Sequence, residues 1–320
     1  MTEVQQPPAI EIHGLKKWYG DLQALKGIDL TIEKGEFYGL LGPNGAGKST
    51  AIHILTGLAN FSDGEVKVLG QDVVKDFRFT RSKIGLAAQE FNFDPFFDIE
   101  KLLTLQGGYF GLKQKKAHER SMELLKQFGL WDKRNQDFRK LSGGMKRRLQ
   151  IAKALVHQPE ILILDEPTAG VDVELRHMLW EYVRNLNDEG VTVLLTTHYI
   201  EEAEQLCERV SIINHGEIIA DGAPKELMDS MGTGCIELQL HEQIDHIPEN
   251  FNGYDASLED NFIRIRVENP NKELQKIIRN VNDNDLGLYE VRIRQSSLED
   301  VFVKLTGKSL HEEAQSGQPE

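Results

Sequence analysis

The segment that most constrains the fold of this chain is the glycine-rich stretch GPNGAGKST at residues 42–50. An apolar run, FYGLL at 37–41, precedes it, and a helical pattern containing Ile52 and Leu55 begins at Lys48. A strand, a glycine loop and a helix in this order direct the loop N–H groups and the positive end of the helix dipole at one point, where they bind phosphate. We therefore predict a phosphate-binding loop between a buried strand and a helix.

The composition of this loop indicates a nucleoside triphosphate with Mg²⁺ as its ligand. Glycines allow consecutive N–H groups to converge on a β-phosphate, because they carry no Cβ. Lys48 reaches the β- and γ-phosphates as a point charge, and the Ser49 hydroxyl is a ligand for Mg²⁺. The predicted nucleotide-binding residues of the loop are Gly42, Pro43, Asn44, Gly45, Ala46, Gly47, Lys48, Ser49 and Thr50.

A second apolar run, ILILDEP at 161–167, ends in two carboxylates. A buried strand at this position would bring Asp165 to a bound Mg²⁺, while Glu166 beside it could accept a proton from an attacking water. Taken alone, a strand that ends in Asp-Glu is more often a solvated strand end. The phosphate-binding loop upstream is what favours the catalytic interpretation.

Three further residues indicate a function only in combination with the glycine loop. Gln89 follows an expected strand, and His198 ends the apolar run VTVLLTTH. A lone glutamine there indicates nothing, and a lone histidine after a strand is more often a packing residue. Tyr19, in KKWYG, is able to stack on adenine, although packing is the commoner role. Trp18 would point to the opposite face of the same strand, so only one of the two residues can stack on the adenine.

Residues 141–145 read LSGGM, and a helical pattern with a basic face follows. A serine and two glycines at a helix start can form an anion site from free N–H groups and the helix dipole. One nucleotide does not require a second such site. Out of context, a helix cap with close packing is the more frequent explanation for Ser142, Gly143 and Gly144.

Together these motifs resemble the ATP-binding subunits of ABC transporters. The glycine loop, Gln89, LSGGM, ILILDEP, AGVD at 169–172 and His198 occur in the order and spacing of that family, over about residues 8–228. The segment SSLEDVFVKLTG at 296–307 is similar to the small C-terminal domain of the ABC-2-type export branch, which extends the resemblance to about residue 307.

The resemblance implies the chemistry and the site residues. ATP and Mg²⁺ are the expected ligands. The catalytic residues would be Glu166, His198, Lys48 and Gln89, the metal ligands Ser49, Gln89 and Asp165, and Tyr19 would contact the base. Two copies would pair head to tail, so that one copy covers the nucleotide of the other with Ser142, Gly143, Gly144 and Asp172.

The resemblance also implies a partner, namely an integral-membrane permease of the ABC-2 type. In relatives, a cytoplasmic helix of the membrane subunit docks just after the glutamine. Here that region is rich in phenylalanine, and we expect Phe93, Phe96 and Phe97 to contact the permease. The protein would then be cytoplasmic and peripheral, held on the inner face of the cell membrane through its permease.

The implied fold class is α/β: a P-loop NTPase of the ABC type, with a helical subdomain and an antiparallel β-subdomain, plus a small C-terminal α+β domain. We expect the nucleotide-binding domain at 1–230, with its helical subdomain at about 91–157. The alternating strands and two helices after residue 230 indicate the small domain at 235–307, followed by a flexible tail at 308–320. No catalytic constellation is recognisable in the small domain.

Composition limits the partners. Lysine and arginine number 37 against 51 aspartates and glutamates, a net charge of −14, so we expect neither nucleic acid nor direct adsorption to anionic lipid. No apolar run approaches the roughly 20 residues of a membrane span, and the N-terminus lacks a signal-peptide pattern, so no direct membrane insertion is expected. The two cysteines, Cys207 and Cys235, have no metal-type spacing and suit a reducing compartment.

Two alternatives stay open. The first is a soluble, non-transport ABC ATPase; a single motif set and the lack of a long coiled-coil pattern between Lys48 and Asp165 count against it. The second is an ATP-gated regulatory module, in which the C-terminal domain acts and ATP only sets the dimer state. Such a module would bind ATP without hydrolysing it.

Overall fold

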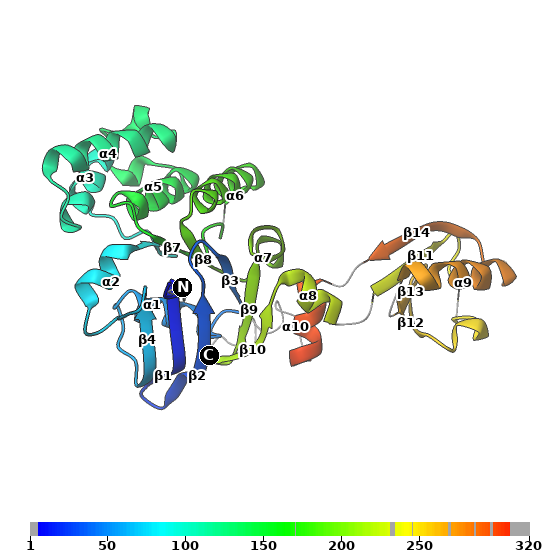
Figure 1. Cartoon of the computed structure of the whole chain (residues 1–320). Coiled ribbons are helices and arrows are strands. Elements are labelled where there is room, and N and C mark those ends of the chain that lie inside the picture. The colour runs from blue at the N-terminus through cyan, green and yellow to red at the C-terminus, as the bar shows by residue number, and fades with distance from the viewer. Residues whose placement is uncertain are drawn as a thin grey trace, which may run out of the picture. The chain divides into compact units, whose positions relative to one another are not determined.

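The chain forms two compact units, one containing the described residues up to Gly222 and the other beginning at Ala223 (Figure 1). This computed structural model describes residues 6–169, 171–230, 234–244, 246–267, 270–284, 286–294 and 297–307. The tail expected at 308–320 lies outside the described residues.

A six-stranded sheet forms the centre of the larger unit, and its β10 alone is antiparallel to its neighbour. Every residue of β3 and β7 is buried, because these apolar runs are covered on both faces, as predicted for strands of a parallel sheet. The strand order is β10 (Glu217–Gly222), β9 (Arg209–Asn214), β3 (Phe37–Leu41), β8 (Thr192–Thr197), β7 (Ile161–Asp165) and β6 (Ile84–Ala87).

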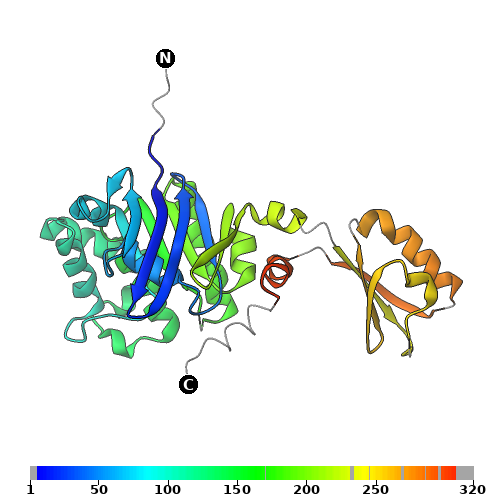
Figure 2. The ribbon, with the colours of Figure 1, turned by 90° about the horizontal axis from the view of Figure 1, so that it is seen from below.

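A smaller antiparallel sheet packs on one side of the larger unit. Its order is β2 (Leu22–Ile32), β1 (Ile10–Tyr19), β4 (Asp63–Val68) and β5 (Gln71–Asp72). Figure 2 shows β1 and β2, in blue, running side by side. One continuous apolar core joins this sheet, helix α1 (Lys48–Leu55) and the six-stranded sheet. The core therefore fixes α1 against both sheets.

The helices of the larger unit lie mainly on the other side of the six-stranded sheet, with α3, α4 and α5 opposite β1, β2 and β4 (Figure 1). Helix α5 packs against β6. The helices are α2 (Phe77–Lys83), α3 (Ile99–Tyr109), α4 (Gln114–Gln127), α5 (Gly143–Leu155), α6 (Val173–Asp188) and α7 (Ile200–Leu206), with 3-10 turns at η1 (Trp131–Lys133) and η2 (Phe138–Lys140).

A polar cluster ties the edge strand β10 to the sheet. The Asp221 carboxylate accepts hydrogen bonds from the hydroxyls of Tyr38 (2.6 Å) and Ser211 (2.9 Å) and from Nε of Arg209 (3.1 Å). Burial alone would raise the pKa of Asp221, but these donors outweigh it and lower the pKa. The ionised carboxylate is therefore part of the folded sheet.

The smaller unit has a core of its own, in which one face of a four-stranded antiparallel sheet meets helix α9. The strand order is β12 (Asp255–Glu259), β13 (Phe262–Val267), β11 (Gly234–Leu240) and β14 (Leu288–Arg294). Its helices are α8 (Pro224–Ser230), α9 (Pro270–Asp283) and α10 (Leu298–Thr306), with a 3-10 turn η3 (Glu249–Phe251). The sequence pattern predicted β11, β13, β14, α9 and α10, but not β12 or α8.

Each unit carries one free cysteine. Cys207 is buried in the larger unit, and a Cβ added to Gly39 would lie 2.8 Å from its Sγ. Cys235 is half-buried in β11. Burial raises the pKa of both thiols.

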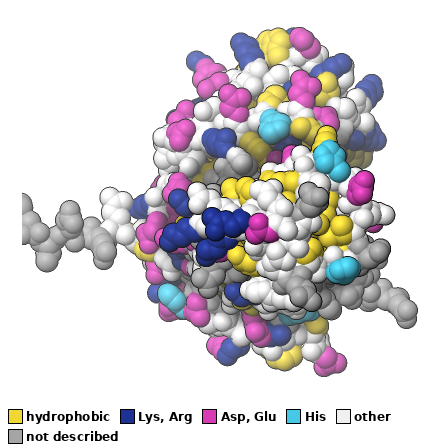
Figure 3. Space-filling model, turned by 90° about the vertical axis from the view of Figure 1, so that its right-hand side faces the viewer, with side chains coloured by type: hydrophobic (Ala, Val, Ile, Leu, Met, Phe, Trp, Pro, Cys, Tyr) yellow, Lys and Arg dark blue, Asp and Glu magenta, His cyan; other side chains and the backbone are white. Residues whose placement is uncertain are grey.

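On the face shown in Figure 3, acidic side chains are scattered, and several basic side chains gather in one cluster beside an apolar area. None of the helices described here is both long and apolar enough to cross a membrane.

Candidate nucleotide-binding and hydrolysis site

The glycine loop curls between the end of β3 and the start of α1, and two of its glycines need to be glycine for steric reasons. A Cβ on Gly42 would lie 2.2 Å from the carbonyl oxygen of Ile213. Gly47 has φ +114°, and a Cβ there would lie 2.8 Å from Cδ2 of Leu25. The absence of side chains lets the loop backbone lie against its neighbours while the first N–H groups of α1 stay open for a ligand.

Hydrogen bonds to strand β8 and to the turn between β9 and β10 hold the loop in place. The Gly42 N–H donates to the carbonyl of Thr197 in β8 (3.3 Å), and the Ala46 carbonyl accepts from the N–H of Gly216 in the β9–β10 turn (2.9 Å). In front of the loop lies a cavity of about 710 Å³. The residues predicted from the sequence that line it are Tyr19, Pro43, Asn44, Gly45, Gly47, Lys48, Ser49, Thr50, Gln89 and Glu166.

Lys48 is a buried cation whose charge is met by the loop and by one carboxylate. Its Nζ donates to the carbonyls of Gly42 (2.6 Å) and Pro43 (3.0 Å) and lies 3.4 Å from Oε1 of Glu166. Burial lowers the pKa of Lys48, and the charge of Glu166 opposes that shift. The ammonium is thus held at the mouth of the phosphate loop.

The two carboxylates at the end of β7 have different surroundings. Oδ1 of Asp165 accepts a hydrogen bond from Oγ1 of Thr196 on the neighbouring strand β8 (2.6 Å). Glu166 has φ +48°, a left-handed conformation that is uncommon for a residue with a side chain, and its N–H donates to the Thr196 carbonyl (3.0 Å). Strain of this kind is concentrated at functional sites.

Three other predicted residues converge on the Glu166 carboxylate. Nε2 of Gln89 donates to Oε2 (3.1 Å), and Nδ1 of His198 lies 3.3 Å from Oε1, although not aligned as a hydrogen bond. Burial alone would raise the pKa of Glu166, but the His198 ring and the Lys48 ammonium outweigh it and lower the pKa. The carboxylate is therefore ionised at neutral pH, as a general base must be.

The donor set beside the loop fits Mg²⁺. A serine hydroxyl, a carboxylate and an amide oxygen are hard oxygen ligands of the kind that Mg²⁺ takes alongside phosphate oxygens. Ser49, Asp165 and Gln89 supply these groups, and because Gln89 donates to Glu166 through its nitrogen, its oxygen remains for a cation. Within the described part of the chain, no group of three or more His, Cys, Asp or Glu side chains could hold a metal ion.

Of the two aromatic residues at the end of β1, only Tyr19 borders the cavity. Its side chain is 47% exposed, and the Lys17 ammonium lies 4.5 Å from the centre of its ring. Trp18 is 46% exposed and is not among the described residues that line this cavity. The position of Tyr19 suits a ring that stacks on a base.

The LSGGM segment caps α5 away from this cavity. The Ser142 hydroxyl accepts from the N–H of Met145 (3.3 Å), and the side chain remains exposed. A Cβ on Gly144 would lie 2.5 Å from Cδ2 of Leu175, so α5 begins in close contact with α6. Asp172 caps α6 by accepting from the Leu175 N–H (2.8 Å). None of Ser142, Gly143, Gly144 and Asp172 is among the described residues lining the cavity of their own chain.

Known proteins share this sequence and this arrangement. The family model described as "ABC transporter" matches residues 25–169. Over 310 residues the chain is 38% identical to the Nod factor export ATP-binding protein I of Burkholderia lata, covering 95% of this chain and 98% of that protein. It is 37% identical to the daunorubicin/doxorubicin resistance ATP-binding protein DrrA of Streptomyces peucetius, covering 95% and 94%.

This chain is an ABC transporter ATP-binding protein.

The fold of this ABC protein agrees with that assignment. A solved structure of the ATP-binding cassette MJ0796, described as a dimer in a post-hydrolysis state bound to ADP and Pi, matches with a TM-score of 0.61 and 29% identity. The match covers 67% of this chain and 98% of that one. The predictions of an α/β P-loop NTPase fold and of an ABC-type ATPase are confirmed.

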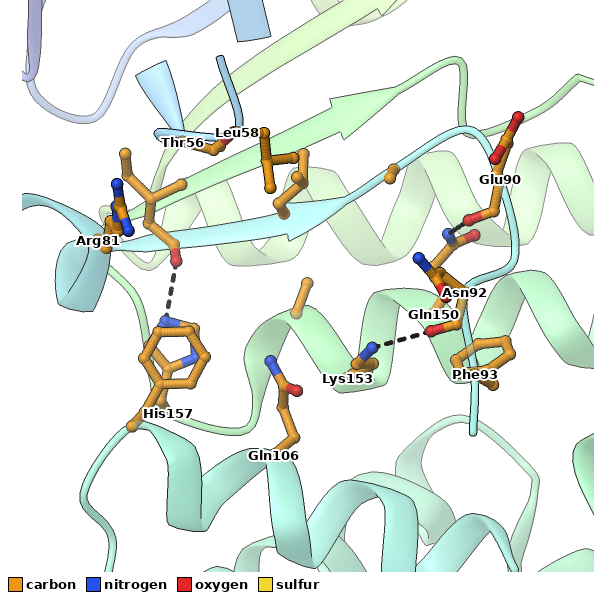
Figure 4. A pocket seen from close by; sticks show the side chains of 15 residues that line it. Thr56, Leu58, Arg81, Glu90, Asn92, Phe93, Gln106, Gln150, Lys153 and His157 are labelled. Atoms are coloured by element: carbon orange, nitrogen blue, oxygen red, sulfur yellow. Dashed lines mark hydrogen bonds between the residues drawn. The ribbon is translucent and has the colours of Figure 1, made fainter. Parts of the chain in front are cut away.

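One feature of the ABC site was not predicted: α5 holds the backbone of the segment after β6. Nη1 of Arg147 donates to the Ala88 carbonyl (3.2 Å), Nε2 of Gln150 to that of Glu90 (2.6 Å), and Nζ of Lys153 to that of Asn92 (3.2 Å). Figure 4 shows the last two contacts. The three donors recur every third residue on one face of the helix. That spacing of polar residues inside a core-facing stripe is the signal from which they could have been found.

Proposed function

We propose that this chain is the ATP-hydrolysing subunit that powers export through a separate integral-membrane permease of the ABC-2 type. The observation that carries the proposal is the convergence of Lys48, Gln89 and His198 on the Glu166 carboxylate, beside a glycine loop and a cavity of about 710 Å³. Export is supported by two relatives, a Nod factor export ATP-binding protein and a daunorubicin/doxorubicin resistance ATP-binding protein.

In the proposed reaction Glu166 accepts the proton of the water that attacks the γ-phosphate. Its lowered pKa keeps it ionised for this task. Lys48 and His198 stabilise the charge that develops on the γ-phosphate, from positions already fixed by their contacts with Glu166. Mg²⁺, bound by Ser49, Asp165 and Gln89, would neutralise charge on the phosphate oxygens.

A second copy would complete the site. Ser142 and Gly143 are exposed at the N-terminus of α5, where N–H groups and the helix dipole favour an anion. Because these residues do not line the cavity of their own chain, we propose that Ser142, Gly144 and Asp172 cover the γ-phosphate held by a head-to-tail partner. Hydrolysis would remove the bridging charge and allow the copies to separate.

The proposed permease contact lies at a second cavity, of about 320 Å³, bordered by α3, α5 and β6. Figure 4 shows Arg81 and His157 at one end and Glu90, Asn92 and Phe93 at the other. Its walls are mainly apolar, which suits the apolar face of an amphipathic helix. Docking there would place the protein on the inner face of the membrane, beside the permease.

The three phenylalanines expected at this contact differ in exposure. Phe96 is 89% exposed, Phe97 is half-buried, and Phe93 is only 7% exposed and packs 5.2 Å from the ring of Phe138. Phe93 therefore forms the wall of the cavity, whereas Phe96 is free to contact a partner directly.

The first test concerns hydrolysis. We expect Glu166→Gln to bind ATP, to accumulate as an ATP-dependent dimer in size-exclusion chromatography, and to hydrolyse ATP roughly 10²–10⁴-fold more slowly. Lys48→Ala should lose ATP binding together with activity, because it removes the phosphate-binding cation. Turnover at the unmodified rate by the glutamine variant would exclude the assigned role of Glu166.

The second test concerns the permease. We expect a membrane protein encoded beside this chain to co-purify with it in detergent and to raise its ATPase rate. Replacing the exposed groove residue Leu58 by Glu should abolish both effects and leave the ATPase rate of the isolated chain unchanged. ATP binding without hydrolysis, alone and with the permease, would instead favour an ATP-gated regulatory module.

A further inference from the structure

Helix α7 carries a buried carboxylate that belongs to none of the ABC motifs. Glu202 is 1% exposed. Its three hydrogen-bond partners are neutral: the hydroxyl of Thr168 on Oε1, the indole Nε1 of Trp180 on Oε1 (3.3 Å), and the hydroxyl of Thr197 on Oε2 (2.6 Å). Burying a carboxylate is costly, and an apolar side chain of similar size would fill this space more cheaply.

The partners of Glu202 stand on both sides of the catalytic pair. Thr168 follows Glu166 after a single proline, and Thr197 immediately precedes His198. Both threonines are almost completely buried, so their hydroxyls have no access to solvent as an alternative partner. The Thr197 hydroxyl also accepts a hydrogen bond from the N–H of Tyr199 (2.9 Å), which fixes the backbone on the far side of His198.

We propose that Glu202 is a positioning residue, which clamps the Thr168 and Thr197 segments together and thereby keeps His198 in contact with the Glu166 carboxylate. This inference rests on the proposed function, because it assigns Glu202 a role in the hydrolysis carried out by Glu166. The link is short: two hydrogen bonds and the intervening backbone join the carboxylate to the residues on either side of the 3.3 Å contact between Nδ1 of His198 and Oε1 of Glu166.

The third partner extends the clamp to α6. Trp180 lies on the same helix whose first turn is capped by Asp172 and whose Leu175 packs on Gly144. Glu202 thus connects the hydrolysis site with the helix that supports the LSGGM segment. A buried network of this kind is sensitive to the loss of any single partner, because the remaining groups stay unsatisfied.

The decisive test changes one partner at a time. Thr197→Val removes the donor and keeps the shape, whereas Thr197→Ser keeps the hydroxyl. We expect the valine variant to lose kcat by roughly 10²-fold, the cost of misplacing a catalytic group by about 1 Å. Its KM and its Kd for ATP should stay as in the unmodified protein. The serine variant should restore kcat. Glu202→Gln should also lower kcat, because the amide has only one acceptor oxygen and its NH2 group must then face either Thr197 or the pair of Thr168 and Trp180.

Two controls separate this proposal from a structural role and from the proposed function. Glu201→Gln changes the neighbouring exposed residue, which pairs with Arg176 (3.7 Å), and should leave kcat unchanged. Full kcat in Thr197→Val, or an equal loss in Thr197→Ser, would overturn the positioning role. If Glu166→Gln, measured in parallel, retains full activity, the proposed function fails instead. A drop in melting temperature with unchanged kcat would reduce Glu202 to a packing residue.

Discussion

The guanidinium of Arg147 donates a hydrogen bond to the carbonyl of Ala88 (3.2 Å), so the helix that Ser142 caps is attached to the segment that carries Gln89. Arg147 is 3% exposed, and its Nη1 also lies 3.4 Å from the Gln89 carbonyl. A displacement of α5 must therefore move Gln89, which contacts Glu166, or break this bond.

We expect Arg147→Met to weaken that coupling. The methionine fills much of the space but leaves the carbonyls of Ala88 and Gln89 without a donor, which should lower the free energy of unfolding by about 1–3 kcal/mol. The ATPase rate should fall by more than the unfolded fraction of the protein accounts for, because Gln89 is no longer held in place. Urea titration and ATPase assays at a temperature where the variant is folded would measure both effects. A variant as active as the original would show that Gln89 needs no support from α5.

Gly144 and Leu175 offer a paired test of the contact between α5 and α6. Gly144→Ala places a Cβ 2.5 Å from Cδ2 of Leu175, so the start of α5 must shift. ATP-dependent dimerisation, measured in the Glu166→Gln background, should weaken. Adding Leu175→Val shortens the opposing side chain and should restore part of the ATP-dependent dimerisation. If the double variant is no better than Gly144→Ala alone, crowding is not the cause.

Tyr19 and Trp18 form a matched pair at the end of β1, with nearly equal exposure. Tyr19→Ala should weaken ATP binding by about 1–3 kcal/mol, the usual value of a stacked base, while Tyr19→Trp should retain it. Trp18→Ala should change affinity by less than about 0.5 kcal/mol, as for an ordinary surface residue. Titration with a fluorescent ATP analogue measures all three. Equal losses at both positions would refute stacking on Tyr19.

The phenylalanines after Gln89 should separate permease binding from folding. Phe96→Ser changes a side chain that is 89% exposed. It should reduce permease binding and leave the unfolding temperature unchanged. Phe93 is only 7% exposed, so Phe93→Ala should leave an internal cavity and lower the free energy of unfolding by about 3–5 kcal/mol. Pull-down with the permease and thermal unfolding distinguish the two. Full binding by Phe96→Ser would exclude this residue from the contact.

Asp221 should make the larger unit sensitive to acid. Its pKa is lower in the folded protein than in the unfolded chain, so its stabilising contribution is complete above the unfolded value of about 3.9. The contribution is lost as the pH falls through the folded pKa. Asp221→Asn should therefore lower the urea midpoint at pH 7 and flatten its decline below about pH 4. The exposed Asp132→Asn is the control, and a parallel decline in both variants would contradict the assignment.

The sequence predicted those parts of the site that lie in short contiguous segments. The glycine loop and the ends of β7 and β8 could be read directly, because neighbouring parallel strands bring Asp165, Glu166 and His198 to one edge of the sheet. The motif order also supplied the fold. Contacts between distant segments were not readable in this way: Arg147 and Ala88 are 59 residues apart, and only the folded chain shows that they meet.

Burial was the other quantity that the sequence did not settle. Phe93 and Phe96 are three residues apart in the same polar and aromatic stretch, yet Phe138 from η2 covers one and leaves the other exposed. Glu202 lies in the polar sequence IEEAEQL, in which nothing distinguishes it from its exposed neighbour Glu201. Its burial depends on α6 and on the loop after β7, which pack over α7.

The two cysteines should react with a thiol reagent at different rates. Because Cys207 is enclosed beside Gly39 while Cys235 lies half-open on β11, a thiol-reactive dye added to the native protein should mark the smaller unit first. Modification of Cys207 would then record the opening of the larger unit. One alkylation time course in urea, read peptide by peptide in a mass spectrometer, would follow the unfolding of the larger unit through Cys207, with the early reaction of Cys235 as an internal reference.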